Sequence, residues 1–362
     1  MSGGVDSSVA AAELCASGYE VVGVTLHLWD YPDDGSVQGR CCAPEDIHDA
    51  RRVCDSLGIA HYAFDRRELF EQTVVTPFVE AYLDGVTPSP CVRCNRGVKI
   101  RELLAIADRL GARCIATGHY ARLRERDGRL ELLRARDLNK DQSYFLHMLA
   151  PEVLRRLKFP LGEMTKQQVR ESAHRWSLPG ADKGESQELC FIPTGRYDTF
   201  VEQRAPERVR PGPILNPQGQ EVGTHAGVHR FTVGQRRNLG VALGERAYVV
   251  GLDSSTATVR LGERSQLLSA GAQLDEVVLA PDVEVPVQCQ VAVRYRGRLQ
   301  GACVEATAGG LRVRFTEPVP AVVPGQYAVL YQGERVLGGG RIAAALPPSV
   351  PEPMDTLPAE HP

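Results

Sequence analysis

The opening segment, Met1 to Ser8, constrains the fold of this chain more than any other stretch. It places two glycines, an acid and hydroxyl groups directly before an apolar run that predicts a helix. Unpaired backbone N–H groups at a helix start, together with the helix dipole, favour a bound phosphate. Gly3 and Gly4 let the backbone approach such an anion closely. The alternative is a segment that only caps a helix, and these residues alone do not separate the two interpretations.

The side chains of this loop add donors and one carboxylate. Ser7 and Ser8 supply hydroxyl groups for phosphate oxygens, and Asp6 can hold a Mg²⁺ ion that neutralises phosphate charge. A loop of this kind normally follows a buried strand, but no such strand precedes it here. We therefore expect the natural chain to start upstream of Met1, with a short β-branched strand that completes the sheet.

Strands and helices alternate through the first half of the chain. Strands are expected at 20–28, 59–64 and 113–117, and helices at 9–17, 44–57, 66–82 and 97–110. Residues 83–96, which contain two prolines, are expected to form a long loop. This alternation predicts a parallel α/β sheet, whose ligands bind at the carboxyl ends of the strands. The opening loop and residues 118–120 would both lie there.

The character of the sequence changes near Gly212, where β-branched runs replace helical periodicity. Strands are expected at 246–252, 256–261, 288–295, 302–306, 311–315, 327–331 and 335–342, which together predict a small barrel. We expect an α/β domain with the catalytic cysteines over 1–203, a central β-rich domain over 204–268, a C-terminal β-barrel over 269–346 and a disordered tail over 347–362.

The composition restricts the class of protein. The formal net charge is -3, so nucleic acid must be bound by local basic patches and not by an overall field. The sequence shows no apolar run of about 18 residues and no secretory leader, which predicts a cytoplasmic protein without a membrane partner. Ten cysteines are too few for a disulfide scaffold, and indicate buried thiols, metal ligands or redox catalysts.

Cys91 and Cys94 form a C-x-x-C motif ahead of a predicted helix. The helix N-terminus and the nearby basic residues are expected to lower a thiol pKa, which suits a nucleophile. These basic residues are Arg93, Arg96 and Lys99. A structural zinc site would need two further ligands, and no second C-x-x-C motif exists. Cys190, between leucine and phenylalanine, is by itself typical of a buried hydrophobic residue.

Two polar segments are candidates for RNA contacts. Residues 225–237 mix basic, aromatic and glycine residues, which suits RNA phosphates and unstacked bases. Residues 139–144 form a dense polar run. Taken alone, the first is more often a charged loop and the second a solvated turn.

Together these segments resemble a known family. Residues 2–7 look like the pyrophosphatase loop of ATP-dependent adenylating enzymes. The whole set is similar to the bacterial tRNA-specific 2-thiouridylase family, over residues 1 to about 346. The motifs are TPSPCVRCN at 87–95, ATGHYAR at 116–122, KDQSYFL at 140–146, SQELCFI at 186–192, FTVGQR at 231–236 and LGGG at 337–340.

The resemblance implies ATP-dependent 2-thiolation of the wobble uridine of tRNA. AMP is attached to the C2 oxygen of the uridine, pyrophosphate leaves, and sulfur then replaces the adenylated oxygen. Cys94 matches the nucleophile, and Cys190 matches the cysteine whose persulfide comes from a cysteine desulfurase or a sulfur-relay protein. The two cysteines can finish as a disulfide. The chemistry is reasonable, since an adenylate leaves readily and thiolates and persulfides are good sulfur nucleophiles.

The resemblance also implies binding residues. ATP and its Mg²⁺ would be held by Ser2, Gly3, Gly4, Val5, Asp6, Ser7, Leu26 and Gly118, with Asp6 as the metal ligand. The tRNA would contact Ser89, Pro90, Cys91, Lys140, Asp141, Gln142, Arg294 and Tyr295. We further expect Cys94 and Cys190 to lie near the opening loop.

Position 91 leaves alternatives open. Some family members carry an aspartate three residues before the nucleophile, so with Cys91 proton transfer cannot be assigned to a carboxylate there. Cys91, Cys94 and Cys190 can instead hold three corners of an iron–sulfur cluster whose fourth iron binds sulfide. Two rival functions also stay open: another adenylating, amidotransferase-like synthetase, and an RNA-binding module without enzymatic activity.

The visible spectrum separates the persulfide and cluster mechanisms. From the persulfide mechanism we expect a protein that is colourless, free of iron and active after aerobic purification. A brown protein with stoichiometric iron, losing thiolation activity when the iron is removed, would establish the cluster mechanism instead.

Overall fold

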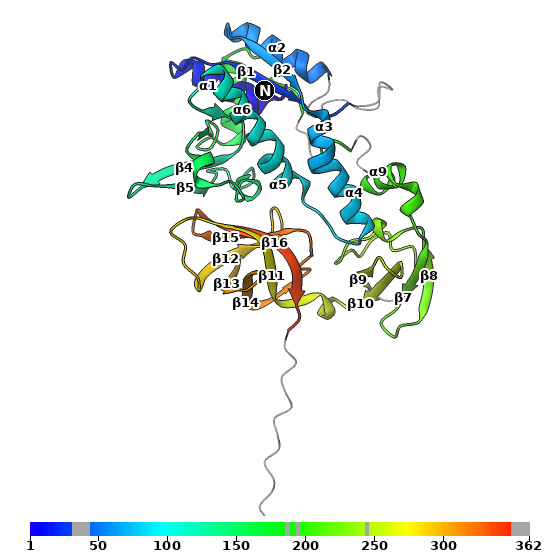
Figure 1. Cartoon of the computed structure of the whole chain (residues 1–362). Coiled ribbons are helices and arrows are strands. Elements are labelled where there is room, and N and C mark those ends of the chain that lie inside the picture. The colour runs from blue at the N-terminus through cyan, green and yellow to red at the C-terminus, as the bar shows by residue number, and fades with distance from the viewer. Residues whose placement is uncertain (31–43, 185–188, 193–195, 243–245, 349–362) are drawn as a thin grey trace, which may run out of the picture.

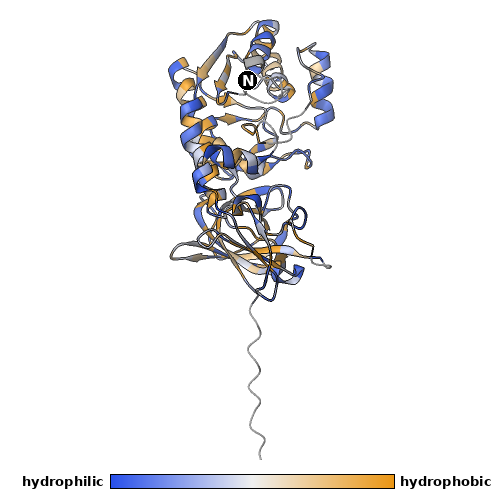
Figure 2. Cartoon of the chain, turned by 90° about the vertical axis from the view of Figure 1, so that its right-hand side faces the viewer, coloured by the Kyte–Doolittle hydropathy of each residue, from blue (hydrophilic) through white to orange (hydrophobic). Residues whose placement is uncertain are grey.

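The computed structural model describes residues 1–30, 44–184, 189–192, 196–242 and 246–348. An α/β part carries the N-terminus, a small β-rich part lies beside α4 and α9, and a barrel lies below the α/β part (Figure 1). Hydrophilic and hydrophobic residues alternate along its helices and strands (Figure 2). Among the described residues, no helix has the length and apolar character needed to cross a membrane.

The α/β part has the expected parallel strands. In chain order its elements begin with α1 (Val5–Ala16), β1 (Gly23–His27), α2 (Pro44–Leu57), β2 (His61–Asp65), α3 (Arg67–Phe70), the π-helical turn η1 (Glu71–Val75) and α4 (Thr76–Leu83). β1 pairs in parallel with β2, and β3 (Ile115–Ala116) pairs in parallel with β6 (Leu157–Lys158). Leu26, Phe70, Phe78 and Phe191 belong to the apolar core beneath β1. The predicted α/β class is confirmed.

The expectation of a loop over 83–96 is wrong in its second half. A helix, α5 (Pro90–Cys94), begins at Pro90 and continues through the π-helical turn η2 (Asn95–Lys99) into α6 (Ile100–Leu110). Proline suits the first turn of a helix, because the N–H that it lacks would have no partner there. The C-x-x-C motif therefore lies within a helical turn and not in a loop.

The rest of the α/β part contains a hairpin that the sequence did not predict. It consists of β4 (Ala121–Arg126) and β5 (Arg129–Arg134), and β5 pairs with strand β16 of the barrel through Leu133 and Arg335. Short helices follow: the 3-10 turn η3 (Ser143–Phe145), α7 (Pro151–Leu154), α8 (Lys166–Arg175) and α9 (Tyr197–Arg204). The hairpin thus joins the α/β part to the barrel sheet.

The β-rich second half follows the expected pattern. A four-stranded sheet has the order β8-β7-β10-β9 and is built from β7 (Gly212–Leu215), β8 (Glu221–His225), β9 (Tyr248–Asp253) and β10 (Thr258–Gly262). Six antiparallel strands then form the barrel, which closes because its first and last strands, β11 and β16, also pair with each other. They are β11 (Leu268–Leu279), β12 (Val287–Ala292), β13 (Gln300–Thr307), β14 (Gly310–Pro320), β15 (Tyr327–Gln332) and β16 (Arg335–Leu346).

The predicted C-terminal barrel is thereby confirmed, whereas the long strand β11 was not foreseen. The charged pair Asp275-Glu276 interrupts its apolar pattern. The boundaries predicted between the domains stay predictions. Of the tail predicted over 347–362, residues 349–362 lie outside the described part of the chain.

A cavity of about 720 Å³ separates β1 from β3. Its walls include the extended residues 19–24 on one side and 114–119 on the other. Apolar side chains of α1 and α6 cover it, among them Leu14, Leu103 and Ile106. In a parallel sheet, a buried strand lies between the edges of two neighbouring strands and is covered by helices. The expectation of a further central strand ahead of the opening loop stays a prediction.

We expect an added strand to stabilise the protein by pairing with the facing edges of β1 and β3, which leaves the space at the opening loop free for a ligand. A chain extended at its N-terminus by about six valine- and isoleucine-rich residues should unfold at a Tm higher by roughly 4 °C or more, because the strand pairs with both edges. Thermal unfolding followed by circular dichroism measures this.

The matched control is an extension of equal length with a central proline, which cannot supply the paired N–H groups. Equal Tm values for the two extended chains would show that the space does not accept a strand.

Candidate functional site

The opening loop folds tightly onto the start of α1. The backbone N–H of Ser2 donates to Ser7 Oγ at 3.1 Å, and the hydroxyl groups of Ser7 and Ser8 each donate to the Gly4 carbonyl at 3.0 Å. Gly3 has φ +68°, and a Cβ there would lie 2.6 Å from the carbonyl oxygen of Asp46. Only glycine fits this position, so the backbone itself forms the floor of the loop.

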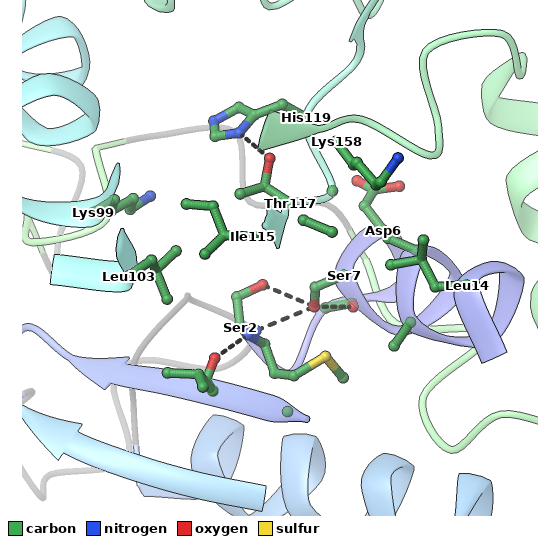
Figure 3. A pocket seen from close by; sticks show the side chains of 18 of the residues that line it. Ser2, Asp6, Ser7, Leu14, Lys99, Leu103, Ile115, Thr117, His119 and Lys158 are labelled. Carbon is green, nitrogen blue, oxygen red and sulfur yellow. Dashed lines mark hydrogen bonds between the residues drawn. The ribbon is translucent and has the colours of Figure 1, made fainter. Parts of the chain in front are cut away.

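The helix start is open to a ligand. Among the described residues no side chain caps α1 at Gly4. Val5, Asp6 and Ser7, which carry the first N–H groups of the helix, line the cavity described above, so an anion bound there can accept these groups. Ser2 and Ser7 hydrogen-bond to each other on one wall of this cavity, below Thr117 and His119 (Figure 3).

Two distant segments complete the wall around the loop. A Cβ at Gly118, which follows β3, would lie 2.9 Å from the backbone of Asp6 and Ser7. Leu26 lies near the end of β1 and lines the same cavity. All the predicted ATP-binding positions except Gly3 line it, and Gly3 supports the loop from behind. The structure thus brings these positions together.

The two predicted reactive cysteines belong to one apolar cluster. Cys94 is 5% exposed and lies within it, and Cys190 packs against it. Leu26 is a member of this cluster and also lines the cavity. Neither cysteine lines the cavity itself, and the expectation that both lie near the opening loop stays a prediction.

Two of the segments predicted to contact tRNA line the cavity, whereas Arg294 and residues 89–91 do not. Lys140 and Gln142 from the α/β part line it together with Tyr295 from the barrel. The Tyr295 ring lies 4.3 Å from the ring of Phe145, centroid to centroid, and the Arg296 guanidinium lies over Tyr295. Aromatic and cationic groups from two parts of the chain thus form one surface.

Asp141 differs from its neighbours. Its carboxylate is buried and accepts hydrogen bonds from Arg134 Nε at 3.0 Å and from the backbone N–H groups of Ala135 and Ser143. These bonds occupy the side chain and fix the turn. Asp141 therefore shapes the loop that presents Lys140 and Gln142.

Three family models match the chain. One described as tRNA methyl transferase HUP domain matches residues 1–194, and one described as tRNA methyl transferase PRC-barrel domain matches residues 198–263. One described as aminomethyltransferase beta-barrel domain matches residues 273–342.

Relatives named tRNA-specific 2-thiouridylase MnmA match almost the whole chain. The protein of Sorangium cellulosum is 60% identical over 352 residues, which are 96% of this chain and 91% of that protein. The protein of Chloroflexus aggregans is 48% identical over 351 residues, 95% of this chain and 97% of that protein. This chain belongs to the tRNA-specific 2-thiouridylase family. The resemblance inferred from its motifs is confirmed.

In this member of the 2-thiouridylase family Cys94 is buried and Cys91 is half-buried, and the expected lowering of their pKa values is wrong for this conformation. Burial raises the pKa of Cys94, and burial together with Cys94 raises the pKa of Cys91 to about 11, while Lys99 opposes both shifts. Cys94 ends α5 and does not lie at its N-terminus.

Cys91, Cys94 and Cys190 are free thiols. Among the described residues, they and other candidate ligands form no group of three that could hold a metal ion.

Several cationic and polar residues of the cavity were not identified from the sequence. Lys166 Nζ donates to Asp6 Oδ1 at 2.7 Å, and Lys183 Nζ pairs with Asp46 and Asp49. Burial, aided by Lys99, lowers the pKa of His119 to about 3, so its ring is neutral at pH 7. The only sequence signal near Lys166 is the capping box formed by Thr165 and Gln168, which indicates that a helix starts there.

We expect Cys94 to react slowly in the folded protein. Because its pKa is raised, the thiolate fraction at pH 7.5 is small, and alkylation by iodoacetamide should speed up as the pH rises toward 9. Peptide mass spectrometry after timed alkylation measures the rate.

The same protein unfolded in guanidinium chloride is the control, and there Cys94 should react at least about tenfold faster at pH 7.5. A folded-state rate equal to the unfolded one would contradict the burial of this thiol.

Proposed function

We propose that this protein catalyses ATP-dependent 2-thiolation of the wobble uridine of tRNA. The observation that carries the proposal is that one cavity is lined both by a phosphate loop and by the aromatic and cationic surface of Lys140, Tyr295 and Arg296. A nucleotide bound at the loop and a base entering from that surface meet in one space. The name of the relatives, tRNA-specific 2-thiouridylase, supports this chemistry.

The first step is adenylation. The backbone N–H groups of α1 and the hydroxyls of Ser2 and Ser7 bind the phosphates of ATP. Leu26 and Gly118 form the wall around the rest of the nucleotide. The C2 oxygen of the uridine attacks the α-phosphorus, the bond to pyrophosphate breaks, and the charge of the leaving group stays at the helix start. The oxygen becomes part of an adenylate, which leaves far more readily than a free carbonyl oxygen.

The second step is sulfur transfer. The terminal sulfur of a Cys190 persulfide bonds to C2 and AMP departs with the former carbonyl oxygen. Cys94 thiolate then attacks Cys190 Sγ, breaks its bond to the transferred sulfur and leaves a disulfide, which a cellular thiol reduces. The shared apolar cluster of Cys94 and Cys190 supports this pairing. A cysteine desulfurase or a sulfur-relay protein, in the cytoplasm, supplies the persulfide.

The tRNA lies across both the α/β part and the barrel. Ser89, Pro90 and Cys91 adjoin the target base, and Lys140, Gln142, Arg294 and Tyr295 contact the RNA, with Asp141 setting the turn. Gln326 of the barrel donates to the carbonyl groups of Thr87 and Pro88 at 3.1 Å. The barrel therefore holds the segment that precedes the nucleophile.

The donor set fits ATP better than it fits a protein-bound metal. Asp6 is the one carboxylate of the loop, and its Oδ1 already accepts hydrogen bonds from Tyr120 Oη and Lys166 Nζ. A Mg²⁺ ion on this carboxylate would lie next to an ammonium group. No step of the proposed reaction therefore depends on a metal held by Asp6, nor on an iron–sulfur cluster.

Mass spectrometry of nucleosides tests the reaction. Uridine in the tRNA should gain one sulfur in place of one oxygen when protein, ATP, Mg²⁺ and a persulfide source are all present. Cys94→Ser and Cys190→Ser should each reduce thiolation by at least about a hundredfold, because each removes a sulfur nucleophile. Both should retain tRNA-dependent release of pyrophosphate within about threefold, because adenylation precedes sulfur transfer.

Cys303→Ser, in the barrel, is the matched control and should thiolate like the unchanged protein. Thiolation by both Cys94→Ser and Cys190→Ser would overturn the sulfur-transfer mechanism. Release of pyrophosphate without tRNA would indicate another adenylating synthetase, and a methylated product would indicate the chemistry named by the family models.

A further inference from the structure

Both carboxylates beside the phosphate loop are already paired with lysines. Asp6 follows the loop glycines and accepts a hydrogen bond from Lys166, the first residue of α8. Asp46 lies directly behind Gly3 and pairs with Lys183. Each pair joins the loop region to a segment far away in the sequence.

The geometry gives both lysines access to the phosphate site. Lys166 and Lys183 line the same cavity as Ser2 and Ser7. The Lys166 side chain is only 11% exposed, and its ammonium also lies 5.9 Å from the ring centroid of Tyr120. These contacts hold the Lys166 ammonium group in a fixed position next to the loop.

The state of Lys183 supports the same conclusion. Burial tends to lower the pKa of Lys183, but Asp46 and Asp49 outweigh burial and raise it, so this lysine stays charged at neutral pH. The Asp46 side chain is only 4% exposed, which keeps it in place as the partner. A charged lysine is therefore available to phosphate oxygens.

We infer that Lys166 and Lys183 are the protein's own ligands for the phosphates, and that Asp6 holds Lys166 in place and is not a magnesium ligand. Pyrophosphate carries more negative charge than a carboxylate, so it attracts both ammonium groups once it is at the loop. Any Mg²⁺ then arrives with the nucleotide. This inference rests on the proposed function, because it assigns the ligands of the same phosphate site.

Binding of inorganic pyrophosphate in EDTA, measured by isothermal titration calorimetry, tests the inference without tRNA or turnover. Lys166→Met and Lys183→Met should each weaken binding by about tenfold or more, because each removes a charge-assisted contact. Asp6→Asn should tighten binding by about threefold or more, because it removes a negative charge next to the phosphates. Lys166→Arg should keep most of the affinity, because it keeps the charge.

Arg175→Met is the matched control, since it removes a positive charge from the exposed last turn of the same helix and should leave binding unchanged. Circular dichroism verifies that each variant is folded, and Lys183→Met carries the test if Lys166→Met does not fold.

A second titration with Mg²⁺ present decides the role of Asp6. The gain in affinity on adding Mg²⁺ should be the same for Asp6→Asn and the unchanged protein. If Asp6→Asn loses that gain while the lysine variants bind normally in EDTA, the inference is wrong. A protein that binds pyrophosphate as expected but does not thiolate tRNA would overturn the proposed reaction and leave these phosphate ligands in place.

Discussion

The carboxylate of Asp6 organises the phosphate site. One of its oxygens accepts hydrogen bonds from Tyr120 Oη at 2.8 Å and from Lys166 Nζ at 2.7 Å, so a single group ties the first helix to two later segments. Gly118 can approach the loop this closely only because it has no side chain. These contacts hold Tyr120 and Lys166 against the start of α1.

The barrel belongs to the site as much as the α/β part does. Tyr144 Oη donates to the Tyr327 carbonyl at 2.9 Å, and Val92, two residues before Cys94, packs in a cluster that includes Tyr327 and Val329 of β15. The helix with Cys94 is thus held between two parts of the chain. Burial of this helix also explains why the thiols are protonated in this conformation, since a thiolate in apolar surroundings lacks solvation.

Much of the fold could be predicted from the sequence, because its signals are local. Helix α2 begins at Pro44 and ends before Gly58, as the proline and glycine indicate. The barrel strands follow from β-branched runs between turns. The prediction failed where local signals conflict with packing: two prolines indicated a loop at 83–96, yet the packing of Val92 and Cys94 stabilises a helix there.

For the site, the sequence by itself determined the chemical groups: a loop of glycines and hydroxyls that suits phosphate, and cysteines that suit sulfur transfer. Its motifs also determined the family. Only the tertiary structure decided which side chains reach the loop, since Tyr120 and Lys166 hydrogen-bond to Asp6 from 114 and 160 positions away. It also decided that the carboxylate of Asp141 is a structural anchor and that Cys94 is a buried thiol. The physical reason is that charge pairing, burial and pKa depend on neighbours in space, and residue spacing along the chain does not specify those neighbours.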